Sequence, residues 1–176
     1  MQRLKRILLA TGIFLLVMLV VGFVLPTYWY AERSVLIQAS PAVVFPYVNS
    51  LKKWRDWSVQ NQRLPESAPE YSGPEAGVGA TSRWQDENGR AVLKIMQSAR
   101  NERIDYQVLF NAGALQAQGS IMLLAEGPAT RVLWKVGGER GSNPAHRYRA
   151  LLDRYWISKD LAASLQILKQ KIESKT

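Results

Sequence analysis

The stretch from Ile7 to Leu25, which contains no charged residue, constrains the fold more than any other feature of this sequence. As an α-helix it would be about 28 Å long, close to the ~30 Å hydrocarbon core of a bilayer. Tyr28, Trp29 and Tyr30 follow directly, and amphipathic rings favour the level of the lipid headgroups. The sequence therefore predicts a single transmembrane helix over residues 7–25, followed by an aromatic belt.

The charges on either side of this stretch predict its orientation. Arg3, Lys5 and Arg6 precede it, whereas Arg33 stands nearly alone after it. Positive residues favour the cytoplasmic side, so we expect a cytoplasmic N-terminus and an extracytoplasmic C-terminal domain. The alternative is a cleaved signal peptide, which needs a shorter apolar core and small residues before the cleavage site. The sequence lacks both features, which favours an uncleaved anchor.

Composition argues against several classes of function. The formal net charge is +9, but beyond the first six residues the cations are scattered and form no long run. Clustered cations are needed to gain from counterion release, so we expect no nucleic-acid partner. The chain has no cysteine and one histidine, His146, which leaves only carboxylates as further metal ligands. We therefore expect no metal and no other cofactor.

Beyond residue 30 the pattern is that of a sheet interrupted by short helices. In residues 103–110 apolar side chains alternate with polar ones, which is typical of a strand with one buried face. Asn88-Gly89 predicts a tight hairpin turn, and Ser40-Pro41 predicts a helix start. We expect short helices at 42–48 and 51–57, a long loop at 58–79, and strands at 32–39, 81–86, 90–99, 103–110, 115–125 and 130–136.

The last part of the chain has the pattern of one long amphipathic helix. Asn143-Pro144 supplies an N-cap and a proline in the first turn, and a kink near Ile157 is conceivable because Ser158 could cap a second helix. An apolar stripe follows, formed by Leu161, Leu165, Leu168 and Ile172. A sheet with one buried face needs a cover, and this helix is the one element large enough. The fold class is therefore α+β, with a curved antiparallel sheet wrapped around a long C-terminal helix.

Several segments, in this order and spacing, resemble the SRPBCC or polyketide-cyclase-like branch of the helix-grip superfamily, to which START and birch-pollen-allergen domains belong. They are RSVLIQASPAVVFPYVNSLKKWRDWS, YSGPEAGVGATSRW, ERIDYQVLF, TRVLWKV and NPAHRYRALLDRYWISKDLAASLQILK. The resemblance covers about residues 31–172. It implies an apolar cavity between sheet and helix, used in the family for lipids, polyketides or other hydrophobic molecules. It also implies a bacterial source, so the predicted transmembrane helix would lie in the cytoplasmic membrane. The family fold does not require this helix, and we therefore expect two parts, residues 1–30 as cytoplasmic tip and anchor and residues 31–176 as the helix-grip domain.

The glycines of YSGPEAGVGATSRW, residues 71–84, suggest a phosphate-binding loop at first sight. Such a loop needs a Gly-Lys-Ser/Thr sequence and a helix whose N-terminus faces the anion. Gly73, Gly77 and Gly79 are instead followed by Ala-Thr-Ser and a strand. We interpret them as backbone positions that bend the chain into the edge of the sheet.

The candidate binding residues are large apolar side chains on predicted inward faces. Aromatic residues dominate most protein cores, so each alone is readily explained by packing. Together they would line an apolar pocket if the sheet and helix do not close on each other completely. The candidates are Trp84, Leu93, Ile95, Tyr106, Phe110, Trp134, Tyr148, Leu152 and Trp156.

Three functions are compatible with these features. The first is a membrane-anchored domain that binds a lipid-like or other hydrophobic small molecule without covalent chemistry. The second is an enzyme, a cyclase, dehydratase or hydrolase that uses Asp, Arg or Tyr for proton transfer in the same cavity. Arg149 and Asp153, four residues apart on the final helix, could form a surface ion pair, or either could lie at the mouth of this cavity. The third is an interaction module in which an exposed region around Trp54 and Trp57 binds a membrane partner; in the first function these two would guard the cavity entrance.

Overall fold

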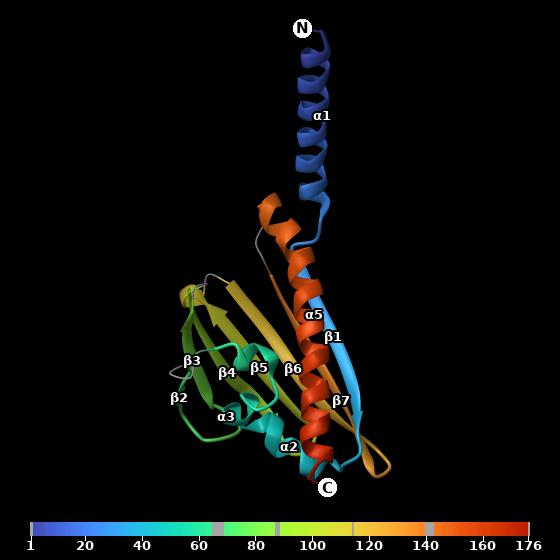
Figure 1. Ribbon diagram of the computed structural model, residues 1–176. Helices are drawn as coiled ribbons and strands as arrows, with labels where there is room; N and C mark the ends of the chain where they lie inside the picture. Colours follow the sequence, from blue (N-terminus) through green and yellow to red (C-terminus); the bar gives the residue numbers. More distant parts are fainter. Residues whose placement is uncertain (1, 65–68, 87–88, 114, 140–142, 176) are drawn as a thin grey trace.

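The computed structural model describes residues 2–64, 69–86, 89–113, 115–139 and 143–175. A long helix precedes a curved sheet, and a second long helix ends the chain (Figure 1). The helical elements are α1 (Gln2–Val24), α2 (Pro41–Asn49), α3 (Leu51–Trp54), α4 (Val59–Gln62), the 3₁₀ turn η1 (Asn111–Gly113) and α5 (Pro144–Glu173). The strands are β1 (Tyr28–Ile37), β2 (Glu70–Ser72), β3 (Thr81–Asp86), β4 (Gly89–Ala99), β5 (Arg103–Phe110), β6 (Leu115–Glu126) and β7 (Ala129–Glu139).

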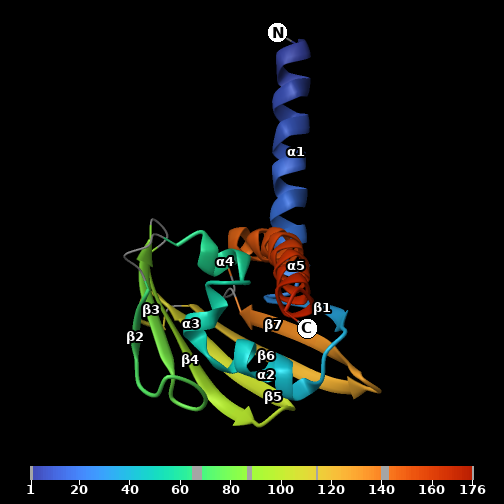
Figure 2. The same cartoon turned by 60° about the horizontal axis from the view of Figure 1, so that its bottom comes forward.

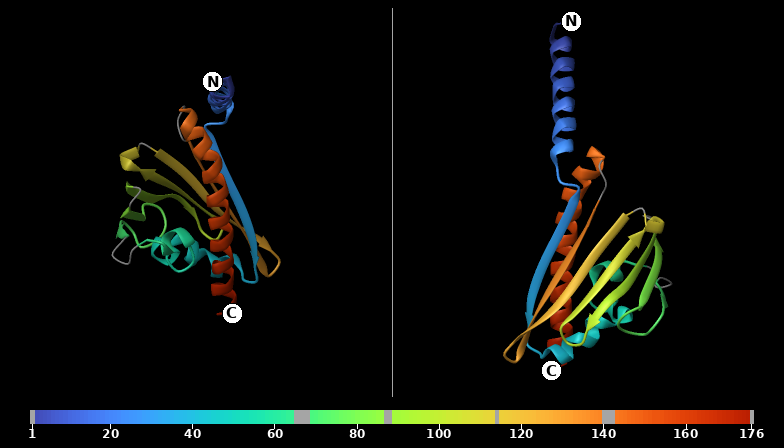
Figure 3. Two further views of the ribbon diagram at one scale, coloured as in Figure 1. Left: turned by 45° about the horizontal axis from the view of Figure 1, so that its top comes forward. Right: turned by 180° about the vertical axis from the view of Figure 1, so that it is seen from behind.

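The seven strands form one antiparallel sheet in the order β1-β7-β6-β5-β4-β3-β2. The sheet curves around α5, which lies along its inner face close to β1, as the two views of Figure 3 show. Helices α2, α3 and α4 close the remaining side of the inner face (Figure 2). This arrangement confirms the predicted α+β helix-grip fold.

The structure departs from the sequence-based expectations at three places. β1 begins at Tyr28, not near residue 32, because it pairs with β7 over its whole length; the buried Trp29 therefore belongs to the core and not to an aromatic belt. The short helix α4 and the short strand β2 both lie within the predicted loop. Helix α5 continues without a break through Ile157. The predicted Asn88-Gly89 turn extends outside the described residues.

The glycines at the entry to β3 have the backbone role that the sequence indicates. Gly73, Gly77 and Gly79 all have positive φ angles, of 79°, 81° and 91°. L-residues other than glycine rarely adopt this conformation. The Gly79 amide donates to the Ile95 carbonyl at 2.9 Å, which joins the bend to β4. The segment is thus a bend into the sheet, and it is followed by strand β3 where a phosphate-binding loop would lead into a helix.

The core is centred on aromatic side chains beneath α5. Trp54 and Trp57 are 2% and 0% exposed, and their ring centroids lie 5.7 and 5.3 Å from that of Trp134. The indole N–H groups of Trp54 and Trp57 donate to the carbonyls of Val48 and Tyr47 at 2.7 and 3.1 Å. The hypotheses that these two tryptophans guard an entrance or form an exposed docking region are therefore wrong. Their indole N–H groups are satisfied locally, which allows both rings to be fully buried.

We predict that Gly119→Ala destabilises the domain by about 1–3 kcal/mol, the usual cost of overpacking a core. A Cβ atom at Gly119 would lie 2.1 Å from Cζ of Tyr106, whose ring crosses this glycine. The ring would have to move and give up its hydrogen bond with Trp134. Chemical denaturation followed by near-UV circular dichroism would measure the effect. Gly12→Ala is the control, because no atom lies within 4 Å of a Cβ there and this glycine of α1 has no positive φ.

Candidate functional site

The inner face of the sheet and α5 do not close on each other completely, and a hollow of about 660 Å³ lies between them. Its wall is mostly aromatic and aliphatic, its cover comes from α5, and its rim is polar. The wall residues are Trp29, Trp54, Trp84, Leu93, Tyr106, Val108, Phe110, Ala117, Trp134 and Val136. Ile157 and Leu161 of α5 cover it, and Gln60, Asn61, Arg63, Leu64 and Asp160 form the rim. We refer to this hollow as the inner pocket.

Five of the nine candidate residues line the inner pocket: Trp84, Leu93, Tyr106, Phe110 and Trp134. They come from β3, β4, β5 and β7, whose alternation places these side chains on the inner face. Ile95 is on the same face but is fully buried in the core away from the pocket. The alternation of strand residues was therefore a sound guide to the sheet side of the pocket.

The three candidates on α5 do not line the inner pocket. Leu152 and Trp156 are 61% and 59% exposed, and Tyr148 contacts α1. The prediction that they lie on the inner face is wrong, and the spacing of the leucines shows why. Leu152 and Leu161 are nine residues apart. Nine residues make two and a half helical turns, so the two leucines lie on opposite sides of the helix. Leu161 faces the sheet, and Leu152 therefore faces away from it.

Some pocket residues were not among the candidates. Trp29 was assigned to an aromatic belt, although its position in an alternating strand, two residues before buried Ala31, indicates the inner face. Ala117 lies on the inner face of β6, with Gly119 next to it on that face and Gly138 opposite it on β7, and its small side chain leaves part of the hollow open. The alternation of β6 indicates its direction, whereas the space above it depends on the curvature of the sheet.

Tyr106 is the polar group in the wall of the inner pocket. Its hydroxyl accepts a hydrogen bond of 2.8 Å from Nε1 of Trp134. Among the described residues this is the one hydrogen bond found for the hydroxyl, so its own hydrogen remains available to a guest. Burial raises the pKa of Tyr106 far above its ordinary value, and the bond from Trp134 opposes this only in part. The hydroxyl therefore stays protonated at neutral pH and acts as a donor.

The rim contains an ion pair between α4 and α5. The guanidinium of Arg63 contacts both carboxylate oxygens of Asp160 at 2.8 and 2.9 Å. The Arg63 side chain is 65% exposed, so water screens the pair and its contribution to stability is small. The pair joins the two elements that border the opening, and it occupies the carboxylate of Asp160.

A second hollow, of about 520 Å³, continues from the inner pocket. The two share Trp29, Trp84, Phe110 and Ala117, and Arg149 and Glu139 lie at the outer end. Trp29 lies where β1 begins, and Glu139 lies beside it where β7 ends. Strand β1 begins four residues after the end of α1. The inner pocket thus has a second opening, at the end of the sheet that is joined to α1. Arg149, expected at the cavity mouth or in a surface ion pair, lies at this mouth.

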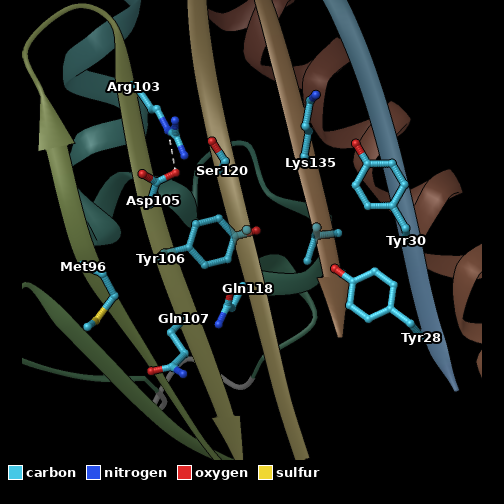
Figure 4. A pocket seen from close by; sticks show the side chains of 13 residues that line it. Tyr28, Tyr30, Met96, Arg103, Asp105, Tyr106, Gln107, Gln118, Ser120 and Lys135 are labelled. Carbon is cyan, nitrogen blue, oxygen red and sulfur yellow. Dashed lines mark hydrogen bonds and ion pairs between the residues drawn. The ribbon is translucent and has the colours of Figure 1, made fainter. Parts of the chain in front are cut away.

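A third hollow, of about 400 Å³, lies on the outer face of the sheet (Figure 4). Its labelled side chains include Tyr28, Tyr30, Lys135 and the ion pair of Arg103 with Asp105, which is 2.7 Å long. These groups are largely polar and face solvent. Met96, Tyr106 and Val136 also line this hollow, which is an open depression of the sheet surface and smaller than the inner pocket.

No group of three or more potential metal-ligating side chains occurs within the part of the chain that the structure describes. His146 lies in the first turn of α5, but its side chain is outside the described part. The chemistry available to the inner pocket is therefore that of an apolar wall, one phenolic donor and a polar rim.

The comparisons with known structures show the same fold. The structure of SA2116 from Staphylococcus aureus matches with a TM-score of 0.64 at 13% identity, covering 84% of this chain and 95% of that one. TTHA0849 from Thermus thermophilus gives a TM-score of 0.63 at 14% identity, with 84% and 99% covered. The Aha1 dimer from Colwellia psychrerythraea gives 0.57 at 17% identity, with 82% and 96% covered. No curated protein sequence matches the chain.

The family comparison agrees with the fold and with the pocket. The family model described as polyketide cyclase/dehydrase and lipid transport matches residues 29–173. This range begins with β1 and ends with the last residue of α5, so it includes every strand of the sheet and leaves out α1. The chain therefore belongs to the polyketide cyclase/dehydrase and lipid transport family.

Proposed function

We propose that this protein binds a lipid-like or other hydrophobic small molecule in the inner pocket and is held at a membrane by α1. The observation that carries the proposal is the inner pocket itself, about 660 Å³ with a largely aromatic wall. Pockets for small molecules have volumes of about 300–1,000 Å³ and combine apolar walls with a few polar groups. Tyr106 provides such a group, because its hydroxyl hydrogen is available to an acceptor on the guest.

The membrane part of the proposal rests on α1. Within the described residues it is the one helix long and apolar enough to cross a membrane, and almost all of it is exposed. We propose a single-pass anchor in the cytoplasmic membrane of a bacterium, with residues 1–30 as tip and anchor and residues 31–176 as an extracytoplasmic binding domain. A pocket held near the bilayer meets membrane molecules at a raised effective concentration, which suits this function.

Co-purification tests the proposal. The full chain would be extracted in detergent, and molecules that remain bound would be identified by mass spectrometry. We expect a reproducible apolar or amphiphilic molecule bound in stoichiometric amounts. An empty pocket in every preparation, with no binding of the cavity probe N-phenyl-1-naphthylamine, would contradict it. A C-terminal reporter active only outside the cytoplasm tests the orientation separately.

We predict that Tyr106→Phe weakens binding of a long-chain ketone about fivefold, because a neutral hydrogen bond contributes about 1 kcal/mol net. Binding of an alkane of equal length should not change, since it offers no acceptor. Displacement of N-phenyl-1-naphthylamine from the full chain in lipid nanodiscs would measure both affinities. The control is Tyr155→Phe, which makes the same change on an exposed tyrosine outside the inner pocket. Equal losses for ketone and alkane would exclude this role of Tyr106.

A cyclase-like or dehydratase-like enzyme is the second candidate. It is favoured by the family description and by the Tyr106 hydroxyl, which could polarise a carbonyl of a bound substrate by donating a hydrogen bond. The raised pKa of Tyr106 makes it a poor acid, so the hydroxyl would keep its proton. Asp160, the carboxylate among the described residues that line the inner pocket, is held by Arg63 at the rim. Turnover of a polyketide or ester substrate that is abolished by Tyr106→Phe would favour the enzyme over the binding protein.

A further inference from the structure

A stripe of large apolar side chains on α5 has no partner in the fold. Leu151, Leu152, Tyr155 and Trp156 are 44%, 61%, 56% and 59% exposed, and we call these four residues the outer stripe. Leu152, Tyr155 and Trp156 lie on the side of α5 away from Leu161, which packs on the sheet, and Leu151 lies at the edge of that side. Contiguous apolar patches of this kind mark contact surfaces. The inner pocket does not use them.

The outer stripe continues the contact between α5 and α1. Tyr148, one turn before Leu152, donates a hydrogen bond of 2.6 Å to the Met18 carbonyl. Gly22 is the one buried residue of α1, and a Cβ there would lie 2.8 Å from Cβ of Pro144, so the helices approach closely. Arg147 also donates to the Leu25 carbonyl at 3.0 Å. The face of α5 that holds α1 is therefore the face that carries the outer stripe.

Helices α1 and α5 are arranged so that this face of α5 points toward the side of the domain from which α1 extends. When α1 stands upright, α5 is seen almost end-on beneath it, with the sheet on the far side of α5 (Figure 2). When α1 is seen end-on, α5 is seen at nearly full length (Figure 3, left). The two axes therefore cross steeply. If α1 crosses a bilayer, α5 lies along the surface of that bilayer and the side opposite to the sheet faces the lipid.

The level along the membrane normal at which α5 contacts α1 agrees with this orientation. Met18 lies within the apolar stretch of α1, so the Tyr148 hydroxyl reaches the level of the hydrocarbon. Trp156 follows Tyr148 by eight residues, about 12 Å along a helix that runs across the membrane normal. Lys159 lies 5.2 and 5.6 Å above the rings of Tyr155 and Trp156. Tyrosine, tryptophan and a lysine that extends to the phosphates are the side chains favoured at the headgroup level.

We propose that the outer stripe lies in the headgroup layer of the bilayer that α1 crosses, so that the folded domain rests on the membrane through α5. This contact with the membrane surface is additional to the anchor. It rests on the proposed function, because that proposal is what places α1 in a bilayer. It holds the domain flat on the membrane beside α1, and the second opening of the inner pocket, at Arg149, lies at the same end as the contact. Helices with an apolar face rich in tryptophan and leucine bind membrane interfaces in this orientation.

Site-specific probes test the contact, and the absence of cysteine in the sequence makes single labelling possible. Leu152→Cys would carry an NBD fluorophore in the full chain, with one copy per nanodisc of phosphatidylcholine and phosphatidylglycerol. Leu124→Cys is the matched control, because Leu124 is 47% exposed on the outer face of the sheet. Phe14→Cys reports on the insertion of α1. We expect iodide quenching at position 152 to be at least about threefold weaker than at 124, with strong quenching by headgroup spin-labelled lipid.

The outcomes separate this inference from the proposed function. Equal iodide access at positions 152 and 124, with the probe at 14 inside the bilayer, would overturn the surface contact and leave the anchor standing. A probe at 14 that is not in the bilayer would overturn the anchor and the contact together. Protection at 152 without quenching by the spin-labelled lipid would show that protein covers the stripe, as in a contact with a second copy, and would also overturn it.

Discussion

Replacing Trp57 with alanine is expected to lower the free energy of unfolding by about 3–5 kcal/mol, the usual range for a buried tryptophan. Trp57 is fully buried, and its ring centroid lies 5.3 Å from those of both Trp54 and Trp134. Truncation removes these ring contacts, leaves a cavity and deprives the Tyr47 carbonyl of its donor. Since a domain of this size is stable by about 5–15 kcal/mol, the loss is a large fraction of the total.

Trp156→Ala is the matched control for Trp57→Ala. The substitution is chemically identical, but Trp156 is 59% exposed, so the change should stay within about 0.5 kcal/mol for the protein in detergent. Unfolding by guanidinium, followed by near-UV circular dichroism, compares the two variants. Similar losses at both positions would contradict the assignment of Trp57 to the core and of Trp156 to the surface.

The sheet was predictable from the sequence because a strand has a simple rule. Side chains alternate between two faces, so a correct strand assignment also predicts which residues face inward. This is why Tyr106, Phe110 and Trp134 were placed correctly on the wall of the pocket. Residues 103–110 were predicted as a strand with the bounds that the structure gives. The rule failed for Trp29 only because its strand was expected to begin later.

The helical side of the pocket was less predictable because α5 is apolar on two faces. Its first half has large apolar residues on the side away from the sheet, and its second half has them on the side that packs on the sheet. In both halves the apolar residues recur every three or four positions. The apolar side of the first half is, however, rotated about the helix axis by half a turn from that of the second half. The first pattern continues from Tyr148, which contacts α1, and no local signal in the sequence reveals that contact. The size of the pocket was also unpredictable, since it depends on how far the curved sheet stands from α5.

Ala117→Phe is expected to lower the amount of bound guest at least about tenfold, because a ring at this position would occupy the space that a guest needs. Ala117 lies on the inner face of β6 and lines both the inner pocket and the hollow that continues from it. A phenylalanine there would therefore block the junction between the two. Mass spectrometry of molecules bound to the purified full chain would measure the loss, with Ala163→Phe on the exposed side of α5 as control.

The stability of the same variant distinguishes a true cavity from a packed core. If the space above Ala117 is open, the added ring fits and the free energy of unfolding should change by less than about 1 kcal/mol. Ala31 is 3% exposed on the inner face of β1 and does not line the pocket, so Ala31→Phe should cost about 1–3 kcal/mol or more. An Ala117→Phe variant that unfolds as readily as Ala31→Phe, or that keeps its guest, would show that the guest does not occupy this space, because a cavity large enough for a ligand must also accommodate one aromatic ring.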